Sequence, residues 1–335
     1  MAGVAGRYPN GTYHGNITLL EYPRFCTLQT CDLTLASFDY RPTLAGNALI
    51  AGIFAIFIFG QIFYGIKHKI WGYMGAILFG LFLECLGYIA RVMIYNNPFN
   101  HNMFLMYLIL LTIAPAFLTA GIYLCLARIV IVYGEHLSRF LPRTYTFIFC
   151  TCDFVSLVLQ GAGGGIASTS NTTSGTNLGK NLMLAGLVFQ VVSLVLFAIC
   201  CGEFGYRVLQ NKGNRNPKHT LVCSSTIFKA FLWGLFIASL TITIRSTYRC
   251  VELAGGFQGE LFRSDEPMFM ILEAVMIVIA TACLTFLHPG EAFQGAWHEA
   301  TFNYFPANGS DKNERSSSDE ENGNVELINV SGFKK

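Results

Sequence analysis

Charged residues are scarce in this chain. Lys, Arg, Asp and Glu make up 13% of its 335 residues, which is about half of their share in ordinary soluble domains. Apolar residues make up 53%, and the mean hydropathy is +0.47. This composition predicts a membrane protein. The formal net charge of +2 identifies no partner, and we expect no nucleic-acid partner.

The motifs of several enzyme and cofactor classes are also missing. The chain has no G-x-x-x-x-G-K-[ST] loop for ATP, no H-E-x-x-H zinc motif and no useful Ser/His/Asp spacing. None of its seven histidines lies deep in a hydrophobic run, which disfavours haem or metal inside the bilayer. Cys150 and Cys152 are too close together for a zinc pair. We therefore predict no enzyme activity, no cofactor and no metal site.

What the chain does contain is a series of seven hydrophobic runs. About 20 apolar residues are needed to cross the hydrocarbon core. The runs cover residues 44–66, 71–95, 104–133, 145–167, 181–204, 222–247 and 267–287. The alternating ten-residue segments of a membrane β-barrel are absent. The predicted fold is an all-α, polytopic bundle of seven transmembrane helices over residues 44–290. Residues 1–43 should form an extracellular segment, and residues 291–335 a mostly disordered cytosolic tail.

Lys and Arg residues gather in the short loops on one side, which is typical of the cytosolic side. Lys67 and Lys69 follow the first run, and Arg139 and Arg143 follow the third, whereas loop 96–102 has no Lys or Arg. We therefore expect the N-terminus outside and the C-terminus in the cytosol, in a multi-pass protein of the plasma membrane. Another endomembrane is the alternative location.

The outer side has features of its own. It carries three N-x-Ser/Thr sites where glycosylation can occur, at Asn10, Asn16 and Asn171. A disulfide between Cys26 and Cys31 is plausible there, although Cys250 also lies at this face and sequence alone does not define the pairing. No signal-peptide core precedes the first run, so we expect that run to act as the insertion signal.

Glu84 is the most informative polar position. It lies near the middle of the second run, where a carboxylate costs several kcal/mol unless it faces protein, water or a partner. Gly72, Ala76 and Gly80 precede it at steps of four, and such a stripe lets a neighbouring helix approach closely. We expect the stripe to point Glu84 into the bundle as a functional group. The alternative is that Glu84 only balances Arg91, which follows seven residues later on the same face.

Other polar positions extend this candidate site. The residues predicted to bind or translocate a substrate are Glu84, Arg91, Gln160, Gln190, Arg245, Arg249, Glu252, Glu266 and Glu273. The spacing of Arg245, Arg249 and Glu252 places them on one helical stripe. We predict an outer vestibule of mixed charge above a polar thread that reaches Glu84. Alternatively, the outer arginines are interfacial anchors.

Two further features are predicted to be structural. Arg128 and Asp153 lie at similar depth in the third and fourth runs, so we predict an ion pair between them. Pro115 lies within the third run, where it removes a backbone hydrogen bond and should kink the helix. A neighbouring helix should then satisfy the freed carbonyl group.

Four stretches of the chain resemble the fungal RTA-like family of lipid-translocating exporters. They are Glu84–Arg91, Ile113–Ile129, Asp153–Gly165 and Arg245–Glu252. The closing Glu266, Glu273 and His288-Pro289-Gly290 are similar as well. Position 270 is Met where an aromatic residue is expected, and position 273 is Glu where Asp is common. Both departures lie beside the predicted outer site, so the resemblance does not define the particular substrate.

The resemblance implies a seven-span protein linked to export of sphingoid long-chain bases, to resistance against amphiphilic toxins, or to porphyrin uptake. We expect a translocator of amphipathic lipids or toxic amphiphiles that does not hydrolyse ATP. Its partners should be membrane lipids and an amphipathic lipid or hydrophobic small molecule. The sequence does not define an oligomeric state. The alternatives are a seven-helix lipid-sensing receptor or a resistance and stress-response membrane protein. Against a receptor, the third run lacks a Glu/Asp-Arg-Tyr triplet and the seventh lacks N-P-x-x-Y.

Overall fold

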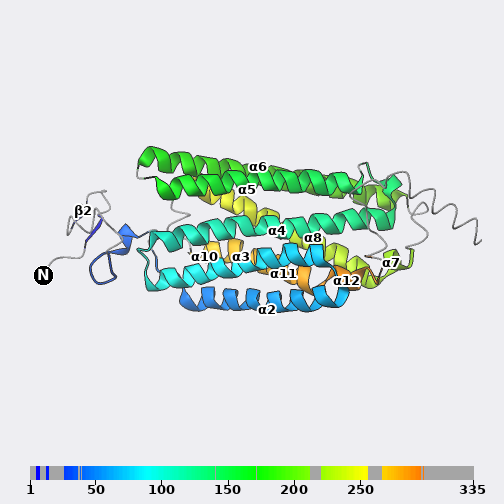
Figure 1. Cartoon of the computed structure of the whole chain (residues 1–335), viewed down its shortest axis with the longest axis horizontal. Coiled ribbons are helices and arrows are strands. Elements are labelled where there is room, and N and C mark those ends of the chain that lie inside the picture. Colours follow the sequence, from blue (N-terminus) through cyan, green and yellow to red (C-terminus); the bar gives the residue numbers. More distant parts are fainter. Residues whose placement is uncertain are drawn as a thin grey trace, which may run out of the picture. The chain divides into compact units, whose positions relative to one another are not determined.

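The computed structural model describes most of the helical part of the chain. The described residues are 5–7, 13–14, 26–36, 38, 40–139, 141–170, 172–211, 220–255, 266–295 and 297. The three predicted glycosylation sites, Asn10, Asn16 and Asn171, lie outside them. Within the described residues, seven helices are long and apolar enough to cross a membrane, which confirms the predicted fold class. Figure 1 shows the helices lying side by side along one long axis.

Six of the seven spans are single long helices. They are α2 (Leu44–His68), α3 (Trp71–Asn96), α4 (His101–Tyr133), α5 (Pro142–Thr169), α6 (Thr173–Gln210) and α8 (Thr226–Ala254). The seventh span consists of α10 (Glu266–Phe269), the π-helical turn η6 (Met270–Val275) and α11 (Met276–Phe286), followed by the short α12 (Pro289–Ala292). The 3-10 turn η2 (Leu33–Leu35) precedes α2, whereas the 3-10 turn η3 (Glu135–Leu137) and the short helix α7 (Thr220–Ser224) lie between spans. In the described part, β structure amounts to the pair β1 (Gly6–Arg7) and β2 (Tyr13–His14) and one bridge.

Helix α6 is longer at both ends than its hydrophobic run. It begins at Thr173 and ends at Gln210, whereas the apolar residues predict a span over 181–204. Thr172 caps its start by accepting a hydrogen bond from the Gly175 backbone at 3.2 Å. Arg207 and Glu203, 2.7 Å apart, form an i,i+4 ion pair near its end. These polar ends extend the helix beyond the part that hydrophobicity can detect.

The helices pack mainly against their neighbours in sequence. Helix α3 lies between α2 and α4, α5 packs on α4 and α6, and α8 contacts α11, α6 and α4 (Figure 1). The stripe of small residues on α3 packs against α4, because a Cβ atom on Gly80 would lie 2.9 Å from the Leu118 side chain. Glu84 on the same stripe is fully buried, as predicted.

Helices α5 and α6 approach each other backbone to backbone. A Cβ atom on Gly163 would lie 2.6 Å from the Gly179 carbonyl oxygen, and one on Gly179 would lie 2.5 Å from the Ala167 nitrogen. No side chain fits at these distances. The GxxxG pair within the glycine-rich stretch, Gly161 and Gly165, meets nothing within 4 Å. The close contact therefore uses Gly163, which lies between them.

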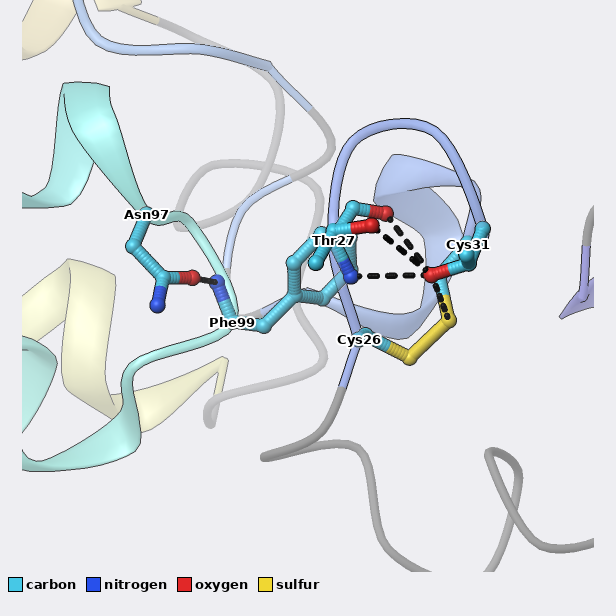
Figure 2. The surroundings of a disulfide bond; sticks show 6 residues. Cys26, Thr27, Cys31, Asn97 and Phe99 are labelled. Carbon is cyan, nitrogen blue, oxygen red and sulfur yellow. Dashed lines mark hydrogen bonds between the residues drawn. A yellow bond between two sulfur atoms is a disulfide. The ribbon is translucent and has the colours of Figure 1, made fainter.

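The segment before α2 contains the expected disulfide. Cys26 and Cys31 are joined, with their Cα atoms 5.5 Å apart. Both pack with Ala5, Ala36 and Phe99 in a small apolar cluster. Figure 2 shows Phe99 beside the disulfide loop, and its backbone N–H donates to Asn97 Oδ1 at 3.2 Å. Through Phe99, the segment before α2 therefore packs against the loop between α3 and α4.

The packed bundle continues past the predicted boundary at residue 290. Phe293 is fully buried, and Trp297 is 5% exposed. The Phe293 ring lies 5.3 Å from that of Phe228 and 5.2 Å from that of Trp297. These aromatic residues belong to the core rather than to a disordered tail, because the turn at His288 and Pro289 directs the chain onto α8.

Candidate functional site

Five charged side chains are buried together between α3, α8 and η6. Glu84 comes from α3, and Glu273 comes from η6. Arg245, Arg249 and Glu252 come from one face of α8, as their spacing predicts. None of the five is more than 4% exposed. We call them the buried ion cluster.

Glu273 lies at the centre of the buried ion cluster. Its Oε1 lies 2.6 Å from Arg245 Nη2 and 3.6 Å from Arg249 Nε. Arg249 Nη1 lies 2.6 Å from Glu252 Oε2. Arg245 Nη2 is also 3.6 Å from Glu84 Oε1. Each arginine therefore has a carboxylate oxygen at 2.6 Å. Glu84 differs from the other two carboxylates, because its ion pair with Arg245 is 3.6 Å long and it has no shorter one among the described residues.

The π-helical turn η6 explains how Glu273 reaches this position. A π-helical turn contains more residues than an α-helical turn and shifts the later side chains around the axis. Glu273 lies within that turn and is fully buried. No glycine or proline occurs in Met270–Val275, so the sequence carries no signal for the turn.

Pro115 connects the cluster to α4. Proline lacks the N–H that would bond to the carbonyl four residues earlier, and that carbonyl belongs to Leu111. Arg245 Nη2 donates a hydrogen bond to it. Arg249 Nη2 donates to Thr112 Oγ1 at 3.2 Å. The prediction that a neighbour satisfies the freed carbonyl is confirmed, and α4 is helical on both sides of the proline.

Glu84 is the least satisfied member of the cluster. Neither of its carboxylate oxygens has a hydrogen-bond partner among the described residues. When all five groups are ionised, three carboxylates face two guanidinium groups, which leaves one negative charge in excess. A buried polar group without a partner costs about 1–3 kcal/mol, and more when it is charged. A cationic ligand would gain most at Glu84.

Tyr88 was missed by the sequence reasoning. It follows Glu84 by one helical turn on the same face and interacts electrostatically with Glu84. Its side chain is fully buried, and its hydroxyl has no hydrogen-bond partner within the described ranges. The i,i+4 spacing from Glu84 is the signal that could have identified it. Glu84 and Tyr88 together offer three unpaired oxygens.

Arg91 belongs to a different group of residues. Its Nε donates to Asn47 Oδ1 at 3.0 Å, and its Nη2 donates to the Tyr40 hydroxyl at 3.2 Å. The guanidinium also lies 3.9 Å from the centre of the Phe269 ring. Burial raises the pKa of Tyr40, although Arg91 acts to lower it, so Tyr40 accepts as a neutral phenol. The ion pairs of the described residues do not include Glu84 with Arg91, because seven residues separate them by about 10 Å along α3.

Glu266 lies apart from the cluster and holds the start of α2. Its Oε1 accepts from the Thr43 backbone at 2.6 Å, and its Oε2 accepts from the Thr43 hydroxyl at 3.0 Å. Asn47 Nδ2 donates to the Thr43 carbonyl at 2.7 Å. Glu266 therefore caps α2 and joins it to α10.

Gln160 and Gln190 form a separate polar contact between α5 and α6. Gln160 Nε2 donates to Gln190 Oε1 at 3.0 Å and to Ser156 Oγ at 2.7 Å. Within the described ranges, no hydrogen bond or ion pair connects this contact to the buried ion cluster. The predicted polar thread therefore has no hydrogen-bonded connection from these amides to Glu84 in the described part of the chain. The close approach of α6 to α5 at Gly186, where a Cβ atom would lie 2.8 Å from the Gln160 side chain, encloses the two amides between those helices.

The predicted ion pair of Arg128 and Asp153 does not form between the described side chains. Asp153 Oδ2 accepts from Thr119 Oγ1 and from the Tyr123 hydroxyl, each at 2.9 Å. Arg128 instead donates to the Trp297 carbonyl and lies 4.2 Å from the centre of that ring. Equal depth was not enough, because Arg128 is five residues after Tyr123 and thus about 140° further round α4.

The conformation around the cluster is closely packed. A cavity of about 10 Å³ lies between α4, α6 and α8, beside Thr112, Arg249 and Glu252. This is roughly the room that one water needs. No group of His, Cys, Asp and Glu side chains among the described residues could hold a metal ion. A ligand larger than a water molecule would therefore require the helices to move before it could occupy this cavity.

This arrangement defines a multi-pass α-helical membrane protein with charged groups enclosed in the bundle rather than exposed to lipid. Residues 77–296 match the family described as "RTA1 like protein". The chain belongs to that family.

Three yeast relatives illustrate the family. The sphingoid long-chain base transporter RSB1 of Saccharomyces cerevisiae is 33% identical over 282 residues, which cover 76% of this chain and 73% of RSB1. Protein RTM1 of Saccharomyces cerevisiae is 32% identical over 210 residues, or 61% of this chain and 63% of RTM1. Protoporphyrin uptake protein 1 of Saccharomyces cerevisiae is 29% identical over 204 residues, or 60% of this chain and 63% of that protein. No solved structure matches the chain.

Proposed function

We propose that this protein moves amphipathic cations of the sphingoid long-chain base class across a membrane, and that Glu84 receives their ammonium head. The observation that carries the proposal is the buried carboxylate of Glu84. Neither of its oxygens has a hydrogen-bond partner among the described residues, and the arginine nitrogen 3.6 Å away, Arg245 Nη2, is shared with Glu273. The name of the relative RSB1, a sphingoid long-chain base transporter, agrees with a substrate of this kind.

The chemistry of the head group matches the unpaired atoms. A primary ammonium has three N–H donors and no acceptor. Glu84 offers two free oxygens, and Tyr88 offers a third. Phe54 of α2 lies with its ring 5.6 Å from that of Tyr88, so an apolar wall stands beside these oxygens. The alkyl tail would stay between helices or in lipid while the head is bound.

An anionic head is a poorer match. Protoporphyrin, named in one relative, carries carboxylates and would need an arginine that is available. Arg245 and Arg249 each already have a carboxylate oxygen at 2.6 Å, and displacing that carboxylate would leave it as a buried, uncompensated charge. Arg91 has the neutral partners Asn47 and Tyr40, and its Nη1 has no hydrogen-bond partner among the described residues, but it lies outside the buried ion cluster. Within the cluster, the group without a hydrogen-bond partner is a carboxylate, which favours a cation there.

We further propose that transport proceeds without ATP hydrolysis or other enzyme activity, in the plasma membrane, with the N-terminus outside. The absence of a P-loop motif and the basic short loops support these proposals. A tag placed after Lys335 should be protected from a membrane-impermeant label on intact cells. Labelling of that tag without permeabilisation would reverse the proposed orientation.

The direct test is transfer of a fluorescent sphingoid base between leaflets of vesicles that contain the purified protein. We expect wild-type protein to accelerate transfer and Glu84→Gln to abolish the acceleration at equal protein content. Glu266→Gln is the matched control, because it removes another carboxylate whose contacts are to Thr43. Binding of the base by wild-type protein without transfer would support the lipid sensor instead.

A further inference from the structure

Asp153 differs from every member of the buried ion cluster in having no basic partner. Its side chain is 3% exposed. Thr119 and Tyr123 both donate to Oδ2, while Oδ1 is buried and has no hydrogen-bond partner among the described residues. Glu84, Glu252 and Glu273 each have an arginine nitrogen within 4.0 Å. Asp153 has no such ion pair in the described part of the chain.

The groups around Asp153 cannot balance its charge. From α4 the facing groups are the Thr119 and Tyr123 hydroxyls, and the titratable neighbour on α5 itself is the Cys150 thiol. Helix α6 contributes the Phe197 ring, 4.6 Å from that of Tyr123, and none of its described charged groups forms an ion pair with Asp153. An isolated carboxylate in such surroundings is strongly disfavoured and is expected to be neutralised.

We propose that Asp153 is a proton-binding site through which a proton gradient drives the lipid transport, a proposal that rests on the proposed function. A metal cation would need several oxygen ligands, whereas one carboxylate oxygen is unpaired here. A proton needs only Oδ1. One O–H bond forms at Oδ1 when a proton arrives from one side of the membrane. The same bond breaks when the proton leaves to the other side, which regenerates the carboxylate without any electron transfer.

Helix α4 links the proton site to the buried ion cluster. Thr112 contacts Arg249, and Thr119 contacts Asp153. These threonines are seven residues apart, so they share one face and lie about 10 Å apart along the axis. Pro115 lies between them, and the Leu111 carbonyl that this proline leaves without a backbone donor accepts a hydrogen bond from Arg245.

Protonation of Asp153 would therefore be transmitted to the cluster through α4. Hydrogen bonds to an ionised carboxylate are roughly twice as strong as those to a neutral group. Neutral Asp153 would thus hold Thr119 and Tyr123 less tightly, and α4 could shift relative to α5. That shift would alter the contacts of α4 with Arg245 and Arg249, the arginines that surround Glu84.

The first test compares variants in vesicles with an imposed pH gradient. Asp153→Asn keeps an oxygen that can accept from Thr119 and Tyr123 but cannot take up a proton. We expect it to bind the fluorescent base normally and to lose all acceleration of transfer by the gradient. Cys150→Ala, which removes the other titratable group on α5, should keep the wild-type gradient response. A gradient response of Asp153→Asn equal to that of wild type would overturn the proton site and leave the role of Glu84 standing.

A second measurement does not depend on transport. Infrared spectra of wild-type protein should contain the C=O stretch of a carboxylic acid that disappears as the buffer changes from mildly acidic to mildly alkaline. This band should be missing in Asp153→Asn and retained in Glu84→Gln. Its retention in Asp153→Asn would contradict the proposal, even if that variant folded poorly. Base binding by Glu84→Gln is measured separately. A failure of the proposed function can therefore be distinguished from a failure of the proton site.

Discussion

The buried ion cluster and the contact between α5 and α6 are both polar and both enclosed within the spans, but they are built differently. Between α5 and α6, two neutral amides meet where glycines bring the backbones together. Gln160 Oε1 and Gln190 Nε2 lack partners in the described part, yet an amide carries no net charge. In the cluster, Glu84 brings a charge that its neighbours do not fully balance. The comparison indicates that incompletely balanced charge, more than polarity or burial, distinguishes the site that we propose for a ligand.

The largest effect is expected from Arg245→Gln. This change leaves Glu273 and Glu84 without their shared guanidinium and the Leu111 carbonyl without its donor. Breaking a buried ion pair costs about 3–5 kcal/mol, so the thermal unfolding temperature in detergent should fall sharply. Adding Glu273→Gln should recover part of the loss. Wild-type stability of Arg245→Gln would refute the view that the cluster is an interdependent set of charges.

A smaller loss is expected from Gly179→Ala at the contact of α5 with α6. The new methyl group would lie 2.5 Å from the Ala167 nitrogen, and overpacking of this kind costs about 1–3 kcal/mol. The control is Gly161→Ala on α5, where nothing lies within 4 Å. We expect thermal unfolding to separate the two variants, while transfer per folded molecule stays at the wild-type level. Equal stability of both would mean that the helices do not depend on this close approach.

Tyr40→Phe should have a modest effect of about 1 kcal/mol, because it removes one of the acceptors for Arg91. The pKa of Tyr40 is raised above its ordinary value of 10.0, chiefly by burial. Its stabilising contribution is therefore intact below pH 10 and is lost as pH rises through the folded-state pKa. Unfolding temperatures measured into the alkaline range should fall less in Tyr40→Phe than in wild type. If the unfolding temperatures of Tyr40→Phe and wild type fell in parallel with pH, the stabilising role of the hydrogen bond between Arg91 and Tyr40 would be contradicted.

The smallest effect is expected from changing Gln160 and Gln190 together to leucine. Replacing both partners of a hydrogen bond by apolar groups is often nearly neutral, and such bonds within membranes average about 0.6 kcal/mol. Transfer of the fluorescent base should stay close to wild type at equal protein content. Loss of transfer in a stable double variant would return these amides to the translocation path.

The fold was predictable because hydrophobic length is a strong signal. Five of the seven spans, α2, α3, α4, α5 and the seventh, begin and end within three residues of their hydrophobic runs. In contrast, α8 covers 226–254 rather than 222–247, and α6 and the end near Trp297 extend further because capping and aromatic packing fix them. The cluster on α8 followed from i, i+4 and i+7 spacing. The pairing of Arg128 with Asp153 failed because depth says nothing about helix rotation. The turn η6 could not be predicted, since Met270–Val275 contains no residue that breaks an α-helix.

The central claim is that Glu84 binds a positive charge on the ligand, and a double-variant cycle of binding constants tests it most directly. The two changes are Glu84→Gln in the protein and N-acetylation of the sphingoid base, which removes its charge. We predict that wild-type protein prefers the amine and that Glu84→Gln binds both forms alike, with a coupling energy of about 1.5 kcal/mol or more. If Glu84→Gln retains the full wild-type preference for the amine, the claim is contradicted.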